Sequence, residues 1–194
     1  MKDLFVNKSF DFINKYQNLD HYGEVKTKYG LEVMYYFITK TTIILLIAYL
    51  IGLLKEVILY NIFFIPLRST SHGFHAKTNL ECWIITAITY IFFILFIKYI
   101  EINYISIFTL SIISVISFIL WSPADTKNLP LIRKNNRLKL KIISLLILIT
   151  ELFLSLLTKY RLFIIFSIIV STLCINPIIY KMFGLKFNNY IDYQ

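Results

Sequence analysis

Long apolar runs without charged residues alternate along this chain with short clusters of charge. Residues 102–124 carry no charged side chain over 23 positions, and residues 162–180 carry none over 19. About 20 apolar residues in helical form cross a hydrocarbon core of roughly 30 Å. The pattern therefore predicts that both runs span a membrane as helices.

Four other apolar runs are shorter or interrupted. Residues 82–97 and 41–54 are uncharged over 16 and 14 positions, and each reaches spanning length by including flanking residues. Residues 142–158 contain one charged residue, Glu151. Residues 57–67 are apolar over only 11 positions, which predicts a re-entrant or tilted half-span.

The first residues of the chain show a different, amphipathic pattern. Charged residues interrupt them, so they do not form a signal peptide. At helical spacing, one face carries Asn7, Asp11, Asn14 and Asn18, and the other carries Phe5, Phe12, Tyr16 and Leu19. This spacing predicts an amphipathic helix lying in the membrane interface within residues 1–30. An ordinary helix packed under the bundle is the alternative.

Composition supports the membrane interpretation. The 194 residues are 58% hydrophobic and 16% charged, whereas ordinary soluble domains have about 45–50% apolar and 25% charged residues. Soluble, disordered and disulfide-scaffold classes are thereby excluded. We expect an all-α polytopic membrane protein in which residues 1–194 form a single integral membrane domain. It should contain about five to six transmembrane or re-entrant helices and the N-terminal interfacial helix.

The basic residues predict an orientation. If residues 57–67 return the chain to the side that it left, 15 of the 20 Lys and Arg residues lie on one side and four on the other, with Lys40 inside a span. The side richer in Lys and Arg is usually cytoplasmic. Both termini and the loops 68–81 and 122–141 are therefore predicted to face the cytosol from the cell membrane. We expect no nucleic-acid partner.

Reactive side chains gather in residues 68–82. This segment holds two of the three histidines and one of the two cysteines. A thiol attacks only as thiolate and needs a base or an environment that favours ionisation, and His75 is the candidate base for Cys82. In one straight helix the two residues would lie about 10.5 Å apart along the axis. A catalytic pair needs about 3 Å.

A capping box resolves this difficulty. Thr78 and Glu81 have the spacing at which each side chain bonds the other residue's backbone amide, so a helix should begin at residue 79. Cys82 then lies in the first turn, where the helix dipole favours a thiolate. His75 lies in the preceding loop, and Gly73 gives that loop freedom to fold back.

Two other interpretations of these residues stay open. In the first, the histidines merely lie at the membrane boundary and the Cys82 thiol is packed. In the second, His72, His75 and Cys82 bind zinc, although no convincing fourth ligand is nearby.

Three segments together resemble a known family. Residues 28–32 (KYGLE), 68–82 (RSTSHGFHAKTNLEC) and 123–131 (PADTKNLPL) are similar to the accessory gene regulator protein B (AgrB) family, and the resemblance extends over nearly the whole chain. Members of this family are polytopic cysteine endopeptidases of Gram-positive bacteria. They process a short pro-peptide into a cyclic quorum-sensing signal.

The resemblance implies roles for individual residues. It implies that Cys82 is the nucleophile, that His75 is the base or proton shuttle, and that Arg68 and Gly73 shape the site. It further implies cleavage of an AgrD-like pro-peptide through an acyl-enzyme thioester and cyclisation of the product to a thiolactone or lactone. The protein is expected to be a homodimer in the lipid bilayer. No metal or cofactor is expected.

The second predicted cytosolic loop holds further candidates. Asp125 can orient His75, or instead cap a helix or pair with Lys127. The loop also contains six basic residues, Lys127, Arg133, Lys134, Arg137, Lys139 and Lys141. They either set the topology alone or also bind an acidic substrate tail.

A second class of function is a small transporter or channel-like protein without covalent catalysis, which would use Glu151, Lys40 and Asn176 along a path. A carboxylate inside a membrane is costly unless it is protonated or partnered, and packing against Asn176 is the structural explanation for Glu151. Cys174 is expected to be an inert packed thiol, and Pro177 a bend.

Overall fold

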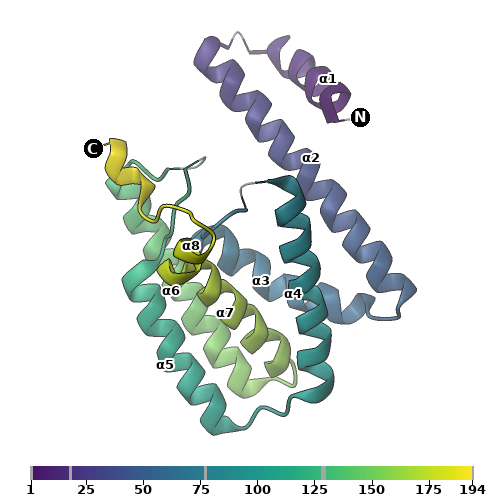
Figure 1. The fold of residues 1–194 in the computed structure, drawn as a ribbon, viewed down its shortest axis with the longest axis vertical. Coiled ribbons are helices and arrows are strands. Elements are labelled where there is room, and N and C mark those ends of the chain that lie inside the picture. The colour runs from purple at the N-terminus through teal and green to yellow at the C-terminus, as the bar shows by residue number, and fades with distance from the viewer. Residues whose placement is uncertain (1, 18, 77, 128–129, 194) are drawn as a thin grey trace. The chain divides into compact units, whose positions relative to one another are not determined.

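The computed structural model describes residues 2–17, 19–76, 78–127 and 130–193, and it is helical (Figure 1). Four helical segments are long and apolar enough to cross a membrane: Gly23–Leu50, Leu80–Ile97, Tyr104–Trp121 and Lys134–Leu157. The all-α membrane fold is therefore confirmed. The chain divides into two compact units, Met1–Val57 and Ile58–Gln194.

The first unit contains helices α1 (Lys2–Asn14) and α2 (His21–Leu50). They pack through a small buried cluster of Val6, Phe10 and Leu31. Of the residues predicted on the apolar face of α1, Phe5 and Leu19 pack against this cluster. Phe12 and Tyr16 are instead 66% and 71% exposed. Only part of the predicted apolar face thus packs against α2, and its placement in a membrane interface stays a prediction.

The second unit is a helical bundle with a short C-terminal segment. Its elements are α3 (Leu54–Ser71, which begins in the first unit), α4 (Asn79–Tyr99), α5 (Tyr104–Trp121), α6 (Lys134–Leu157), α7 (Arg161–Ile175), α8 (Pro177–Met182) and the 3₁₀ helix η1 (Asn189–Tyr193). Helices α5, α6 and α7 pack side by side, and α4 packs against α7 (Figure 1). Buried apolar residues of these helices form the core, including Phe118, Leu148 and Ile168.

Aromatic rings join α3 to the bundle. The ring of Tyr60 lies 4.6 Å from that of Phe93 in α4 and 5.5 Å from that of Phe166 in α7. Residues 57–67, which the sequence predicts as a half-span, form the middle of this 18-residue helix. The end of α3 therefore has a fixed place beside α4 and α7.

Glu151 lies in the bundle core with a serine as its partner. The side chain is 5% exposed, and the Ser167 hydroxyl of α7 donates to its Oε2 at 3.4 Å. Asn176, the partner expected from the sequence, instead caps α8, since its Oδ1 accepts from the backbone N–H of Ile178 at 2.8 Å. Polar contacts between helices join them in an apolar environment.

The charge-free run 162–180 predicts one spanning helix, but the structure divides it at Asn176. Helix α7 has 15 residues and is about 22 Å long, which is shorter than a hydrocarbon core of roughly 30 Å. Proline restricts the residue before it to extended backbone, and Asn176 has φ −75° and ψ 125°. Pro177 also lacks the backbone N–H that would make the next hydrogen bond of the helix. The break frees carbonyl groups at the end of α7.

Candidate catalytic site

The predicted capping box forms and fixes the position of Cys82. The Thr78 hydroxyl accepts from the Glu81 N–H at 3.2 Å, and the Glu81 carboxylate accepts from the Thr78 N–H at 3.2 Å. Helix α4 accordingly begins at residue 79. The Cys82 N–H makes an early helical bond to the Thr78 carbonyl, at 3.1 Å. Cys82 thus lies in the first turn, as the sequence predicts.

The loop that carries His75 is held by a second loop. The Gly73 N–H donates to the carbonyl of Ala124 at 2.8 Å, and the Ala124 N–H donates to the carbonyl of Ser71 at 3.0 Å. His72 and Ala124 form a parallel β-bridge through these bonds. The two predicted cytosolic loops, 68–81 and 122–141, therefore meet directly.

The broken end of α7 holds the same loop from another side. The Phe74 N–H donates to the carbonyl of Cys174 at 2.9 Å. Arg68, in the last turn of α3, donates through Nη2 to the Phe74 carbonyl at 2.7 Å. The Phe74 ring stacks on Phe183 with a centroid distance of 5.1 Å. Phe74 is thus anchored through its amide, carbonyl and ring, and His75 follows it directly.

Gly73 is needed for this close packing. It has φ +121°, a conformation that side-chain-bearing residues rarely adopt. A Cβ atom there would lie 2.6 Å from Arg68 Nη1 and 2.6 Å from the Cys174 carbonyl oxygen. Arg68 and Gly73 therefore both contact the backbone next to His75; that they shape a catalytic site stays a prediction.

His75 and Cys82 line one cavity of about 190 Å³, which we call the cysteine pocket. Its other lining residues, from α3, α4, α7 and the loop, are Tyr60, Phe64, Arg68, Phe74, Ala76, Ile85, Thr86, Thr89, Tyr90, Val170 and Cys174. Cys82 is half-buried and His75 is exposed. The thiol, the imidazole and a mainly apolar wall thus meet at one cavity.

A second cavity of about 440 Å³ also reaches His75, and we call it the lysine pocket. It is lined by His75, Ala76, Thr126, Lys127, Tyr180, Gly184, Leu185, Lys186 and Asn189. His75 and Ala76 belong to both cavities. A peptide bound beside His75 could therefore contact both cavities.

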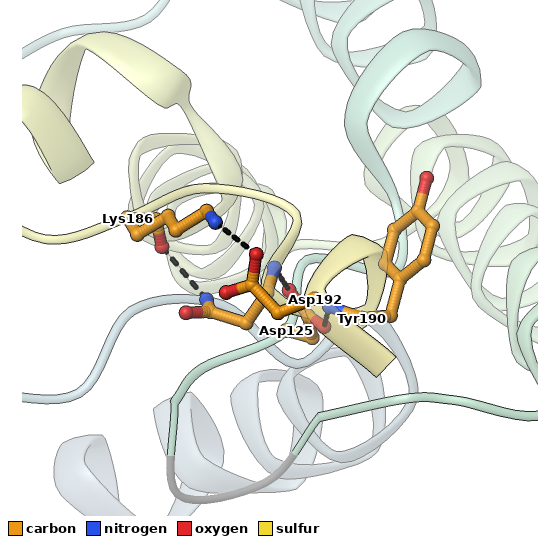
Figure 2. Close-up of polar contacts among 5 residues, drawn as sticks. Asp125, Lys186, Tyr190 and Asp192 are labelled. Carbon is orange, nitrogen blue, oxygen red and sulfur yellow. Dashed lines mark hydrogen bonds and ion pairs between the residues drawn. The ribbon is translucent and has the colours of Figure 1, made fainter. Parts of the chain in front are cut away.

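Asp125 lies beneath the lysine pocket and is 2% exposed. Its carboxylate accepts from the N–H groups of Asn189 and Tyr190, each at 2.8 Å (Figure 2). It also accepts from the N–H of Leu131 at 3.3 Å. Backbone groups thus occupy both oxygens. This carboxylate holds the C-terminal segment against the loop, and it directly follows Ala124, which forms the β-bridge with His72.

Tyr180 is a site residue that the sequence reasoning missed. Its ring is 1% exposed, and its hydroxyl donates to the backbone carbonyl of Asp125 at 2.9 Å. Burial raises the pKa of this hydroxyl above its ordinary value, which keeps it protonated as a donor. The wide spacing between Tyr180 and Asp125 in sequence gave no signal of this contact.

The basic residues of the second loop have different surroundings. Lys127 is exposed and lines the lysine pocket with His75. The guanidinium of Arg137 lies 3.6 Å from the Tyr190 ring centroid and donates to the Leu131 carbonyl at 3.1 Å. Arg137 therefore supports the C-terminal segment, whereas Lys127 faces the candidate site.

The zinc alternative requires His72, His75 and Cys82 to come together. Across the described part of the chain, which includes all three residues, no group of three or more His, Cys, Asp or Glu side chains is arranged to hold a metal ion.

Replacing Asp125 with asparagine should loosen the C-terminal segment. The amide keeps one acceptor oxygen but turns an NH₂ group toward a backbone N–H, and leaving a buried donor unsatisfied costs about 1–3 kcal/mol. We expect a lower melting temperature and faster proteolysis within residues 183–192. Asp192→Asn, at an exposed ion pair, should change the melting temperature little. Equal stability of Asp125→Asn and the unmodified protein would contradict the proposed anchoring.

His72 should make stability depend on pH. Burial, and secondly the charge of Arg68, lower the pKa of its imidazole below the ordinary 6.5, against a smaller opposing effect of Asp125. The unfolded chain then binds the proton more readily, so stability should fall as the pH drops below about 6.5. His72 has φ 54°, which asparagine tolerates. Melting temperatures from pH 8 to 5 should fall less steeply for His72→Asn, and parallel curves would refute this.

The fold and the site together define a polytopic membrane protein with a cysteine and a histidine at one cavity beside the first turn of a helix. The chain belongs to the AgrB family, because the family model "Accessory gene regulator B" matches residues 6–181. This membership links it to the agr quorum-sensing system.

Curated relatives agree with this assignment. An AgrB-like protein of Listeria innocua is 31% identical over 178 residues, covering 90% of this chain and 87% of the relative. Accessory gene regulator protein B of Staphylococcus aureus is 30% identical, covering 92% and 96%. An AgrB-like protein of Clostridium acetobutylicum is 28% identical, covering 94% and 88%. No solved structure matches this chain significantly.

Proposed function

We propose that this protein is a membrane cysteine endopeptidase that cleaves a short AgrD-like pro-peptide and supports cyclisation of the product. The observation that carries the proposal is that His75 and Cys82 line the same cavity. The capping box supports it, because it begins α4 just before Cys82 and leaves His75 in a separately anchored loop. Family membership supports a role in the same signalling system.

The first half of the reaction releases the tail of the pro-peptide. His75 accepts the proton of the Cys82 thiol, and the thiolate attacks the scissile carbonyl carbon. The tetrahedral intermediate collapses when the C–N bond breaks, and the imidazolium gives its proton to the leaving amine. An acyl-enzyme thioester on Cys82 and a free tail remain.

The second half closes the ring. An internal cysteine thiol of the bound peptide attacks the thioester carbonyl, forms the thiolactone and returns Cys82 to its thiol form; an internal serine would give a lactone. Water competes for the same thioester. A well-placed intramolecular nucleophile has an effective molarity of about 10⁵ M or more and can outcompete water. The apolar walls of the cysteine pocket suit this requirement, because they limit access of water.

The site is proposed to face the cytosol. This orientation rests on the 15 of 20 basic residues assigned to one side of the membrane. In that arrangement the amphipathic part of a precursor could lie in the inner interface beside the site.

Purified protein in lipid nanodiscs, mixed with a synthetic precursor, tests the proposal. Mass spectrometry should detect the released tail and a cyclic product lacking it. Intact precursor after prolonged incubation with folded protein would argue against an endopeptidase.

A further inference from the structure

The segment of residues 183–192, which we call the C-terminal strap, forms one wall of the lysine pocket. Helix α8 ends in a Schellman motif, in which the Leu185 N–H donates to the Tyr180 carbonyl at 2.8 Å and the Gly184 N–H donates to the Lys181 carbonyl at 3.0 Å. Gly184 has φ 58°, as this motif requires. The chain then turns back across the site.

Apolar and polar contacts both fix the strap. Leu185 and Phe187 pack against the core, and the Phe187 ring lies 5.2 Å from the Tyr180 ring. The Asn189 side chain donates to the Lys186 carbonyl at 2.8 Å. Together with the Asp125 carboxylate, these contacts hold Lys186 at the pocket wall. The strap lies beyond residues 6–181, the part of the chain that the family model matches.

The charged side chains that line this pocket are basic. Lys127 of the second loop and Lys186 of the strap both line it, and none of the described residues that line it is acidic. The Lys186 ammonium is paired with the carboxylate of Asp192, within the strap itself (Figure 2). The two side chains are 55% and 53% exposed. An exposed ion pair of this kind is weak, so another carboxylate can replace Asp192 without a large cost.

We infer that the strap binds the departing segment of the peptide, through an exchange in which a carboxylate of that segment replaces Asp192 at Lys186. This inference rests on the proposed function, because His75, the proposed base, lines both the lysine pocket and the cysteine pocket. A peptide cleaved between the two would leave its acyl part beside Cys82 and its departing part beside Lys186. When no peptide is bound, the Asp192 carboxylate pairs with the Lys186 ammonium.

Steady-state cleavage of two synthetic precursors tests the exchange. One carries acidic residues in the departing segment, and the other carries glutamine or asparagine at the same positions. Lys186→Gln should raise KM for the acidic precursor by about two- to fivefold, the effect of an exposed ion pair, and leave kcat and the neutral precursor unchanged. Asp192→Asn should lower KM for the acidic precursor, because it removes the competing carboxylate. Lys186→Glu should reverse the preference.

The control is Lys181→Gln, which removes an exposed lysine of α8 that is not among the lining residues. It should leave both precursors unaffected. Equal effects of Lys186→Gln on the two precursors, or none on either, would overturn the exchange while cleavage itself persists. If the unmodified protein cleaves neither precursor, the proposed function fails instead, so the two failures are distinguishable.

Discussion

Cys82→Ala is expected to abolish cleavage of the precursor peptide. The substitution removes the only atom that the mechanism uses to form the acyl-enzyme, and loss of a catalytic nucleophile lowers turnover by a factor of about 10³ or more. Tail release from a synthetic precursor, followed by mass spectrometry in nanodiscs, measures this effect. Because Cys82 is half-buried near the start of α4, its loss should change the melting temperature little.

The chain offers a matched control in its second thiol. Cys174 lines the same cavity, but the contact that it makes to the His75 loop is through its backbone carbonyl. Cys174→Ala should therefore retain most of the activity. His75→Ala should lower turnover by about 10² to 10⁴, the usual contribution of a general base. Full cleavage by both Cys82→Ala and His75→Ala would rule out the cysteine endopeptidase.

Gly73→Ala should also have a large effect, although Gly73 has no reactive atom. The new methyl group would lie 2.6 Å from the Cys174 carbonyl oxygen, which is backbone and cannot move aside alone. A residue held at an unfavourable positive φ costs about 1–3 kcal/mol, and overpacking adds about 1–3 kcal/mol. Relief of the clash would shift the His75 loop, and a misplacement of about 1 Å can lower turnover roughly 10²-fold.

Gly30→Ala is the control for this substitution. Gly30 lies inside α2, and apart from the nearby backbone of α2 and its chain neighbours no atom lies within 4 Å of the position of its Cβ. Alanine there should be neutral or stabilising by about 0.5–1 kcal/mol. Turnover and melting temperature should therefore fall for Gly73→Ala and hold for Gly30→Ala. Comparable behaviour of the two variants would mean that the close approach at Gly73 does not position His75.

A third comparison separates catalysis from transport. Glu151 is buried in the bundle beside Ser167, away from the residues that line either pocket. Glu151→Gln keeps a similar shape and a polar partner for the serine. For an endopeptidase, Glu151→Gln should leave cleavage intact. A transporter that depends on this carboxylate would instead lose transport in Glu151→Gln and retain transport in Cys82→Ala.

Local features of the site were predictable from sequence because they depend on neighbouring residues. Thr78 and Glu81 are three positions apart, and the capping box that this spacing defines begins α4 as predicted. The long apolar runs likewise predicted spanning helices, since their length is set by the thickness of the bilayer. The place of Cys82 in a first turn follows from these two local rules.

Contacts between distant segments were not predictable in the same way. The Asp125 carboxylate binds backbone N–H groups at residues 189 and 190, and backbone N–H groups carry no sequence signature. The proline that follows Asn176 indicates the break there, but a count of consecutive uncharged residues does not reveal it. Its consequence, a bond from Phe74 to the Cys174 carbonyl, depends on the packing of α7 beside the loop.

The most direct test of the account is the identity of the residue that carries the acyl group. Protein mixed with a precursor whose internal nucleophile is replaced by alanine should accumulate the thioester, since ring closure is blocked. Intact mass spectrometry should show an added mass equal to that of the tail-less precursor fragment, as its free acid, minus one water. Hydroxylamine should remove it, and peptide mapping should locate it on Cys82. An adduct on Cys174, or tail release with no adduct on either cysteine under rapid quenching, would contradict the mechanism.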